Sequence, residues 1–402
     1  MPQVKPDIET FAKLKVIGVG GSGGSAVNRM ISSRIRGVDF ITMNTDVQAL
    51  HHSSAPQKLH IGKTVTRGLG AGMDPELGRK AAEETQNEIR DIVKDADMVF
   101  ITCGLGGGTG SGAAPIVAAI AKESGALTVA VVTKPFDFEG PQRQNIADRA
   151  LEQLAKNVDA IITIPNDRIL QIIDKKTSLL DSFKIVDDVL RQGVQGIAEL
   201  ITIPGLINVD FADVKTIMRD AGSALMGIGL GTGENRAAEA AKSAISSPLL
   251  ELSIDGARGI LFTITGGPDM TMHEVSEAAK IVTSSASEDA KVIFGANVDE
   301  SMTGSMRISV IATGFDDRRP NVPAMEEDQA ASFFASGKYA PSNFMRKAQK
   351  DEEEEEKKFK QIIQNNNTHG QMPRNASFLS KDKNNGEDDL EIPTFLRKKM
   401  GI

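Results

Sequence analysis

Two glycine-rich segments stand where strand-like runs give way to helix-like patterns. The first is Gly18–Ser25, and the second, Gly104–Gly112, has six glycines in nine residues. Glycine lets backbone N–H groups approach an anion closely, and a helix that follows directly points its positive dipole end at the same place. Two such segments on one sheet edge predict a polyphosphate held from both sides, with hydroxyls of Ser22, Ser25 and Thr109 adding to the cradle.

The charged side chains that often accompany a phosphate site are scarce around these glycines. Neither segment contains a lysine. Gly62-Lys63-Thr64 resembles the end of a P-loop, but the first glycine that this motif requires falls on Gln57. We therefore expect backbone N–H groups, a metal ion and Arg143 to meet the negative charge of the phosphates.

Pairs of residues at helical spacing offer further chemistry. Asp210 and Asp213 stand at an expected helix start, where they would serve as an N-cap and a first-turn acid or would position a water for hydrolysis. Phe183 and Asp187 are four apart on a long expected helix. They favour core packing, or else a ring that stacks on a base with a carboxylate beside it. Spacing alone leaves both alternatives open.

An alternation of strands and helices must position these residues. Short β-branched runs alternate with helical spacing, which is typical of a doubly wound, mostly parallel α/β sheet covered on both faces. A long helix over Ser178–Ile201 then interrupts the alternation. The expected strands are Leu14–Val19, Val38–Met43, Met98–Cys103, Leu127–Thr133 and Ala160–Ile164.

A second, smaller α/β domain is expected after the long helix, with strands over Ala224–Ile228, Gly259–Thr265, Lys291–Phe294 and Ile308–Ala312 and helices over Asn235–Ser246 and Met272–Ser284. A helix is also expected to begin at Ala113, with Pro115 in its first turn. The predicted division of the chain is 1–12 as an N-terminal extension, 13–177 as the first domain, 178–203 as the central helix, 204–316 as the second domain, 317–388 as a linker and 389–402 as a terminal peptide.

Composition excludes several classes of function. The 402 residues are 40% hydrophobic and 25% charged, which is globular, and a single Cys excludes internal disulfides and fits a reducing cytosol. A net charge of −8 argues against nucleic acid as a partner. The sequence has no apolar run of 18 residues and no signal-peptide core, so we expect a cytoplasmic protein without direct membrane insertion.

The region after Phe315 differs in composition from the rest. Asp316–Ile402 holds 16 acidic and 15 basic residues and few aliphatic ones, which predicts disorder up to the terminal peptide. That peptide contains a short apolar island. Its members, predicted to bind partner proteins, are Leu390, Ile392, Pro393, Phe395 and Leu396.

One alternative from another class is a nicotinamide-dependent oxidoreductase. The glycines of Gly18–Gly24, followed by Asp46 after the second strand, fit a dinucleotide fingerprint. A nicotinamide enzyme needs one glycine segment of this kind, so the second segment disfavours this interpretation. A third alternative is a scaffold that binds a nucleotide and polymerises without hydrolysing it.

Four motifs together resemble a known family. Gly106–Gly112 closely resembles the GGGTG[TS]G signature of tubulin and its bacterial relatives. Lys134–Gly140, Ile164–Asp167 and Asn208–Asp213 are similar to the FtsZ family of bacterial cell-division GTPases. The resemblance covers Lys13–Phe315 and resumes at Leu390–Leu396.

The resemblance implies a GTPase that assembles head-to-tail into filaments and forms the division ring at the midcell septum, with Mg²⁺ accompanying GTP or GDP. It implies membrane-anchoring and regulatory division proteins as partners of the terminal peptide. It makes 13–177 the GTP-binding domain. The implied nucleotide-binding residues are Gly21, Ser22, Gly23, Gly24, Ser25, Ala71, Gly72, Gly108, Thr109, Gly110, Glu139, Arg143, Asn166, Phe183 and Asp187. The implied catalytic residues, which would enter the pocket of the next subunit, are Asn208, Asp210 and Asp213.

The sequence departs from the family pattern at three of these positions or beside them. Many relatives have asparagines where this chain has Gly24 and Ser25, so at these two positions the resemblance carries over the role of the backbone alone. Asp188 stands where many relatives have asparagine, so the choice of Asp187 depends on its spacing from Phe183.

Overall fold

A computed structural model of the chain describes residues 12–171, 177–202, 205–247, 254, 256–287 and 289–315. All of them belong to one of the two units into which the chain divides, Met1–Asp317. The linker expected over 317–388 and the partner-binding peptide Leu390–Leu396 lie outside the described residues.

The first half of the fold is a six-stranded parallel sheet in the order β3-β2-β1-β4-β5-β6. Five of its strands are the predicted ones. The sixth, β3, was not predicted, because it is a short edge strand in which only Leu59 is buried. The strands are β1 Leu14–Val19, β2 Val38–Asn44, β3 Gln57–His60, β4 Met98–Gly104, β5 Leu127–Lys134 and β6 Ala160–Pro165.

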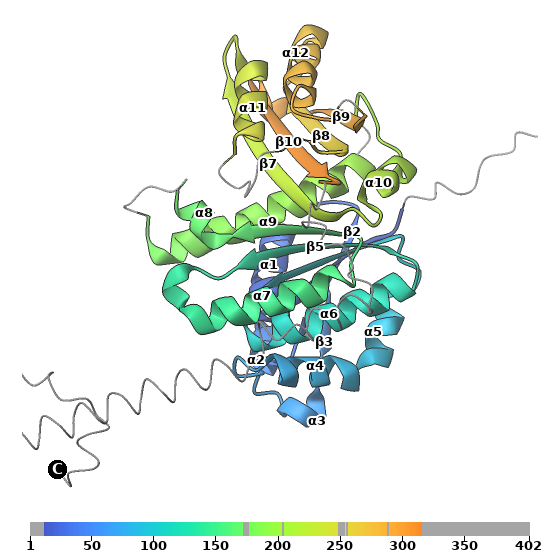
Figure 1. The fold of residues 1–402 in the computed structure, drawn as a ribbon, viewed down its shortest axis with the longest axis vertical. Helices are drawn as coiled ribbons and strands as arrows, with labels where there is room; N and C mark the ends of the chain where they lie inside the picture. Colours follow the sequence, from blue (N-terminus) through green and yellow to red (C-terminus); the bar gives the residue numbers. More distant parts are fainter. Residues whose placement is uncertain are drawn as a thin grey trace, which may run out of the picture. The chain divides into compact units, whose positions relative to one another are not determined.

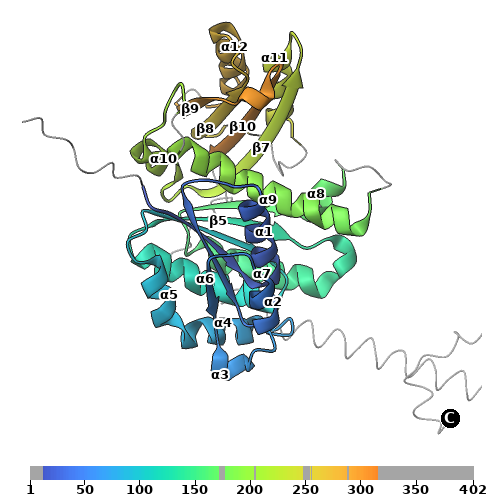
Figure 2. The ribbon, with the colours of Figure 1, turned by 180° about the vertical axis from the view of Figure 1, so that it is seen from behind.

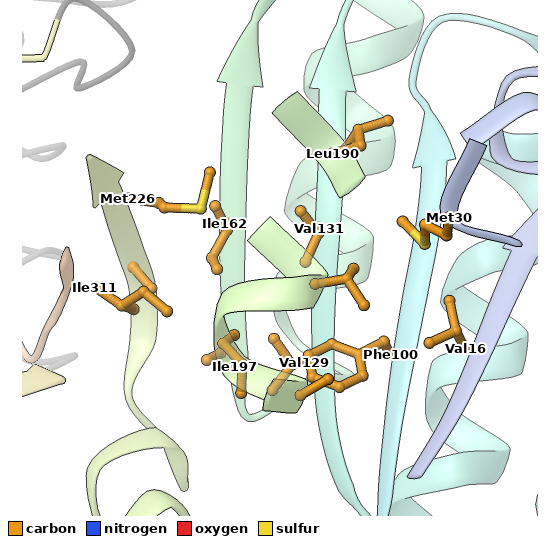
Figure 3. Close-up of a cluster of buried hydrophobic side chains, with 14 of the residues drawn as sticks. Val16, Met30, Phe100, Val129, Val131, Ile162, Leu190, Ile197, Met226 and Ile311 are labelled. Atoms are coloured by element: carbon orange, nitrogen blue, oxygen red, sulfur yellow. The ribbon is translucent and has the colours of Figure 1, made fainter. Parts of the chain in front are cut away.

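Helices cover both faces of this sheet, as predicted (Figures 1 and 2). On one face, Phe100, Val129 and Val131 pack against α1 and α9 (Figure 3). On the other face, Ile101 and Val132 pack against α4 to α7. The helices of this half are α1 Gly20–Ser32, α2 Val47–His52, α3 Lys63–Thr66, α4 Pro75–Glu84, α5 Gln86–Val93, α6 Gly108–Glu123, α7 Pro141–Ala155 and α8 Asn166–Leu170, with a 3-10 turn η1 Asp137–Glu139.

The predicted long helix is α9, Leu179–Thr202. Its apolar stripe contributes Leu190 and Ile197 to the core of the first half, and the same cluster includes Met226 and Ile311 from the second half (Figure 3). The helix is therefore buried between the two halves. Among the described helices, none combines the length and apolar character needed to span a bilayer.

The second half contains a mixed four-stranded sheet in the order β7-β10-β8-β9, in which β10 is antiparallel to both of its neighbours. Its apolar face packs against α11 and α12. The elements are α10 Phe211–Met218, β7 Gly222–Thr232, α11 Arg236–Ile245, β8 Gly259–Gly266, α12 Met272–Thr283, β9 Lys291–Val298, a 3-10 turn η2 Glu300–Met302 and β10 Ser305–Thr313.

The two sheets are joined edge to edge, which the sequence did not predict. Residues Ala160–Ile162 of β6 pair in parallel with Gly222–Ala224 of β7, so the described strands form one ten-stranded sheet. The short run Gly222-Ser223-Ala224 lacks the apolar pattern of a sheet interior, and for that reason the predicted strand began only at Ala224.

The glycine segments are helical over most of their length, which corrects the expected loops. Helix α6 begins at Gly108, five residues earlier than predicted, so Pro115 lies in its interior and not in its first turn. The reason is backbone packing between helices. A Cβ on Gly112 would lie 1.9 Å from the carbonyl oxygen of Pro75, and a Cβ on Gly78 would lie 2.3 Å from that of Gly108. Close contact between α4 and α6 thus offsets the low helix propensity of glycine.

We expect Gly112→Ala to destabilise the protein by about 1–3 kcal/mol, because the new methyl group would force α4 and α6 apart. Urea unfolding followed by circular dichroism measures the change. The matched control is Gly196→Ala inside α9, where the nearest atom to the new Cβ is that of Ser309 at 3.8 Å. The control should be neutral or stabilising by up to about 1 kcal/mol. Equal destabilisation by both variants would contradict the packing explanation.

Candidate functional site

A cavity of about 430 Å³ opens at the carboxyl ends of β1, β4, β5 and β6. Open α/β sheets bind their ligands at this edge, and the volume suits a nucleotide-sized molecule. The residues that line it are Val19, Gly20, Gly21, Ser22, Ser25, Gly104, Leu105, Gly107, Gly108, Thr109, Gly110, Thr133, Pro135, Glu139, Arg143, Asn166, Phe183, Val186 and Asp187.

Two helix N-termini meet in the floor of the cavity. Neither α1 nor α6 has a side-chain N-cap or an acidic residue in its first turn, so their first N–H groups and positive dipole ends are left for an anion. The approach is close because a Cβ on Gly20 would lie 3.0 Å from the backbone nitrogen of Gly110. Gly20 also has a φ of +77°, which favours glycine. The arrangement is an anion site made of main-chain donors.

Hydroxyl groups reinforce this floor. The Thr109 hydroxyl lies 2.7 Å from that of Thr45 in a buried contact, and the Ser111 hydroxyl accepts a hydrogen bond from the backbone N–H of Gly106 at 2.9 Å. These bonds fix the first turn of α6. Ser22 and Thr109 both line the cavity.

One ion pair forms part of the rim. Arg143 and Glu139 are bonded to each other across one turn, and a Glu139 oxygen also accepts a hydrogen bond from the backbone N–H of Phe136 at 3.0 Å. Among the described residues that line the cavity, Arg143 carries the one positive side chain. It is therefore the side chain suited to an anionic group, and Glu139 holds it in place.

An aromatic side chain faces the far end of the cavity. Phe183 is 42% exposed, which disfavours the core interpretation of this residue. Its ring makes a T-shaped contact with buried Phe136, with centroids 5.7 Å apart and planes at 81°. Phe136 in turn stacks on Phe138 at 4.9 Å. The ring of Phe183 is thus fixed on one side and free on the other to stack on a flat ligand.

Asp187 lies one turn along α9 from Phe183 and lines the same end of the cavity. Burial raises the pKa of its carboxyl to about 6, and the positive charge of Arg29 opposes this shift. The neighbouring Asp188 bonds instead to Arg191 and Gln192 on its own helix. The structure therefore puts Asp187, and not Asp188, at the cavity.

A buried hydrogen-bond acceptor also lines the cavity. Asn166, the first residue of α8, is 6% exposed, and its side-chain oxygen has no hydrogen-bond partner among the described residues. An unsatisfied buried acceptor costs about 1–3 kcal/mol. Its presence inside a cavity points to a ligand that donates a hydrogen bond.

Two of the predicted nucleotide-binding glycines lie behind the cavity wall. A Cβ on Gly23 would lie 2.4 Å from the carbonyl oxygen of Thr102, and one on Gly24 would lie 3.2 Å from the Thr42 side chain. Both glycines face the sheet and do not line the cavity. They allow α1 to pack closely on β2 and β4.

Ala71 and Gly72 also stand outside the set of lining residues. Ala71 supports the first turn of α6, since a Cβ on Gly108 would lie 2.9 Å from the Ala71 methyl group. Gly72 has a φ of +53°, in a segment where Arg67, Gly68, Gly70 and Met73 also have positive φ.

The predicted catalytic residues are exposed and lie away from the cavity of their own chain. Asp210 is the N-cap of α10 and accepts a hydrogen bond from the backbone N–H of Ala212 at 3.1 Å. Asn208 accepts one from the backbone N–H of Gly205 at 2.6 Å. Asp213 is a first-turn acid of α10.

Helix α10 lies at the other end of the strands, on the side of their amino ends. Lys215 and Arg219, at its carboxyl end, line a small hollow beside the starts of β5 and β6. Both ribbon views place α8 and α10 at opposite ends of α9 (Figures 1 and 2). Since Asn166 of α8 lines the cavity, the carboxylates of α10 do not reach it.

Several lining residues were not predicted. Leu105 and Pro135 directly follow β4 and β5, Thr133 is the last residue but one of β5, and Val186 precedes Asp187 on α9. The general position of ligands at strand ends could have identified the first three. Val186 carries no such signal because it looks like any other apolar residue of the helix.

Two further predictions concern a metal ion and a dinucleotide. The described residues contain no group of three or more His, Cys, Asp or Glu side chains that could hold a metal ion. The Asp46 carboxylate, which the oxidoreductase alternative requires, caps α2 by accepting hydrogen bonds from Gln48 and Ala49 at 2.8 and 3.3 Å. It does not line the cavity.

Two known protein families match this chain, one over each half of the fold. The family described as "Tubulin/FtsZ family, GTPase domain" matches residues 13–174, and the one described as "FtsZ family, C-terminal domain" matches residues 222–316. The fold, the cavity and the family match over residues 13–174 together define a GTPase domain of the tubulin and FtsZ class. With both matches in the expected order, the chain belongs to the FtsZ family.

Solved structures with a similar fold support this assignment to the FtsZ family. An empty dimer of FtsZ from M. jannaschii is 46% identical, with a TM-score of 0.74, over 77% of this chain and 90% of the other. A GTPγS-bound protofilament of CetZ2 from Haloferax volcanii is 24% identical, with a TM-score of 0.64, over 81% of this chain and 99% of the other, and shows the fold alone. A GDP-bound monomer of CetZ1 from the same organism is 22% identical, with a TM-score of 0.66, over the same shares of the two chains, and likewise shows the fold alone. That this chain comes from a bacterium stays a prediction.

We expect Asp187→Asn to be more stable than the wild type at neutral pH. The folded-state pKa of about 6 lies above the ordinary 3.8, so the folded protein holds this proton more tightly than the unfolded chain. The resulting stabilisation is full below about pH 4 and is lost as the pH rises through about 6. The variant should exceed the wild type by about 1–3 kcal/mol at pH 7.5 and match it near pH 4. Urea unfolding across this range tests it, and a pH-independent difference would contradict it.

Proposed function

We propose that this chain is a polymerising GTPase, which binds GTP in the cavity and hydrolyses it to GDP and phosphate at the junction between successive subunits. The observation that carries the proposal is that the cavity and the exposed acids of α10 lie at opposite ends of the strands. The cavity at one edge of the sheet offers main-chain donors for phosphates, and the exposed acids of α10 stand at the other edge. A head-to-tail contact would bring the two together and, being heterologous, would grow a filament.

The carboxylates of the cavity support the need for a second subunit. Glu139 is held in its ion pair with Arg143, and Asp187 lies at the end of the cavity that faces Phe183. Neither belongs to the first turns of α1 and α6, where the phosphates would bind. A water that attacks the terminal phosphate therefore needs a positioning group from elsewhere.

Each part of the site has a role in this proposal. The first turns of α1 and α6 would bind the phosphates, and Arg143 would neutralise part of their charge. Phe183 would stack on the base, while the carboxylate of Asp187 would accept hydrogen bonds from guanine N1–H and the exocyclic amine. Asp210, Asp213 and Asn208 of the next subunit would orient the attacking water. Mg²⁺ fits as an ion carried in by the phosphates, since it keeps most of its waters and needs few protein ligands.

The cellular part of the proposal rests on family membership. Members named FtsZ appear among the similar structures as a dimer, which supports self-association of this chain. We propose that its filaments form the division ring at the midcell septum in the cytoplasm. The terminal peptide 389–402 would bind membrane-anchoring and regulatory division proteins.

We expect Asp210→Asn to bind GTP and assemble while hydrolysis falls at least tenfold. Asparagine is as good an N-cap as aspartate, so the variant removes the charge and keeps α10 intact. Phosphate release per subunit, measured across a range of protein concentrations, should rise with assembly in the wild type. Asp299→Asn, which changes the exposed cap of η2, is the matched control and should hydrolyse normally.

Two results would contradict the shared site. One is loss of GTP affinity in Asp210→Asn, which would assign Asp210 to its own pocket. The other is a wild-type rate per subunit that stays constant from the monomer to the filament, which would assign hydrolysis to a single chain.

We expect deletion of residues 389–402 to leave GTP hydrolysis unchanged and to abolish recruitment to membrane-anchoring division proteins. The cavity and α10 both lie within 12–315, so the deletion removes neither part of the site. Co-sedimentation with an anchor protein on vesicles measures recruitment. A second variant, with serine at Leu390, Ile392, Phe395 and Leu396, keeps the chain length and should behave the same way. A large fall in hydrolysis would contradict the separation of the two functions.

A further inference from the structure

Two buried hydroxyl groups connect the end of β2 to the start of α6. Thr45 directly follows β2 and is fully buried, and its hydroxyl oxygen lies 2.7 Å from that of Thr109, the second residue of α6. Thr109 lines the cavity, and Thr45 does not. Within the described part of the chain, each hydroxyl has the other as its only hydrogen-bond partner. Thr45 therefore supports the cavity floor from behind, through one hydrogen bond.

The burial of Thr45 decides which hydroxyl donates in this bond. Each hydroxyl carries one hydrogen and can also accept. Thr45 has no access to solvent, so its hydrogen can be satisfied only by the oxygen of Thr109. If Thr109 donated instead, the hydrogen of Thr45 would be buried without an acceptor, which is costly. Thr45 is therefore the donor, and Thr109 accepts.

This direction leaves the hydrogen of the Thr109 hydroxyl for a ligand. The described residues provide no acceptor for it, and Thr109 borders the cavity, so the acceptor has to come from a molecule bound there. The first turn of α6 also offers free backbone N–H groups, so an anion suits all of these donors. A phosphate oxygen would accept a charge-assisted bond from Thr109, and the bond from Thr45 would polarise that hydroxyl and strengthen it.

Hydrogen bonds on both sides hold the backbone of Thr45 in place. The backbone oxygen of Asn44 accepts from the N–H of Ile61 at 3.0 Å, and its side-chain oxygen accepts from the N–H of Asp46 at 3.2 Å. The backbone oxygen of Thr45 accepts from the hydroxyl of Thr66 at 3.4 Å. These bonds fix the point from which the hydroxyl of Thr45 reaches α6.

We propose that Thr45 is a positioning residue for nucleotide phosphates. By donating to Thr109, it sets the Thr109 hydroxyl as a donor to a phosphate oxygen in the cavity. The inference rests on the proposed binding of GTP, and it adds a residue that touches no ligand itself. A simple fastener between β2 and α6 would support the whole cavity, whereas this role concerns the phosphates alone.

The test compares dissociation constants of GTP, GDP and guanosine, with protein dilute enough to stay unassembled. Thr45→Val keeps the shape of the side chain and removes its donor. It should weaken GTP and GDP by about three- to tenfold and leave guanosine unchanged, because guanosine has no phosphate. Thr45→Ser keeps the hydroxyl and should restore most of the affinity. Thermal melting confirms that each variant is folded, and Thr45→Ala takes the place of Thr45→Val if the latter does not fold.

The matched control is Thr42→Val on β2. Thr42 is also buried, and its hydroxyl oxygen lies 2.9 Å from that of Ser53. Neither residue lines the cavity, so the variant breaks a bond of the same kind elsewhere. It should bind all three ligands as the wild type does.

A double-mutant cycle tests whether Thr45 acts through Thr109. Thr109→Val should itself weaken GTP and GDP, and the addition of Thr45→Val should cause little further loss. Full additivity, equal weakening of guanosine, or no weakening by Thr45→Val would overturn the inference. So would a Thr45→Ser variant that binds as weakly as Thr45→Val. A wild-type chain that binds ATP as tightly as GTP would instead overturn the proposed function, while the effect of Thr45 on the phosphates would stand.

Discussion

The contact between the first turns of α1 and α6 is the constraint on which the rest of the structure depends. Two positive helix ends are brought within a few ångströms of each other, and only glycines allow the backbones to meet so closely. The anion that would relieve this repulsion is the ligand itself. Arg143, Phe183 and Asp187 line the cavity that opens around that point.

The sequence predicted most of the first half because parallel strands read as plain apolar runs. It failed where the pattern was short or ambiguous. The edge strand β3 has a single buried residue, and the pairing of β6 with β7 involves Gly222-Ser223-Ala224, which has no strand signal. The start of α6 was placed five residues too late because glycine has a low helix propensity. That argument omits the packing of α6 on α4, which exists only in the folded state.

The sequence predicted the side chains of the site better than its glycines. Side chains with chemistry of their own, such as Asn166 and Asp187, line the cavity as the motifs implied. Glycines were harder to assign, since one residue type serves two purposes. Gly21 and Gly108 line the cavity, whereas Gly23 and Gly24 allow α1 to rest on the sheet. Spacing does not distinguish these uses, because both require the absence of a side chain.

The edge-to-edge pairing of β6 with β7 has a mechanical consequence. Asn166 follows directly from β6, and the same strand holds the second half of the protein through three residue pairs. A displacement of β7 would therefore be transmitted through β6 to the buried amide that lines the cavity. The continuous sheet therefore connects the second half of the molecule directly to the strand that leads into the cavity of the first.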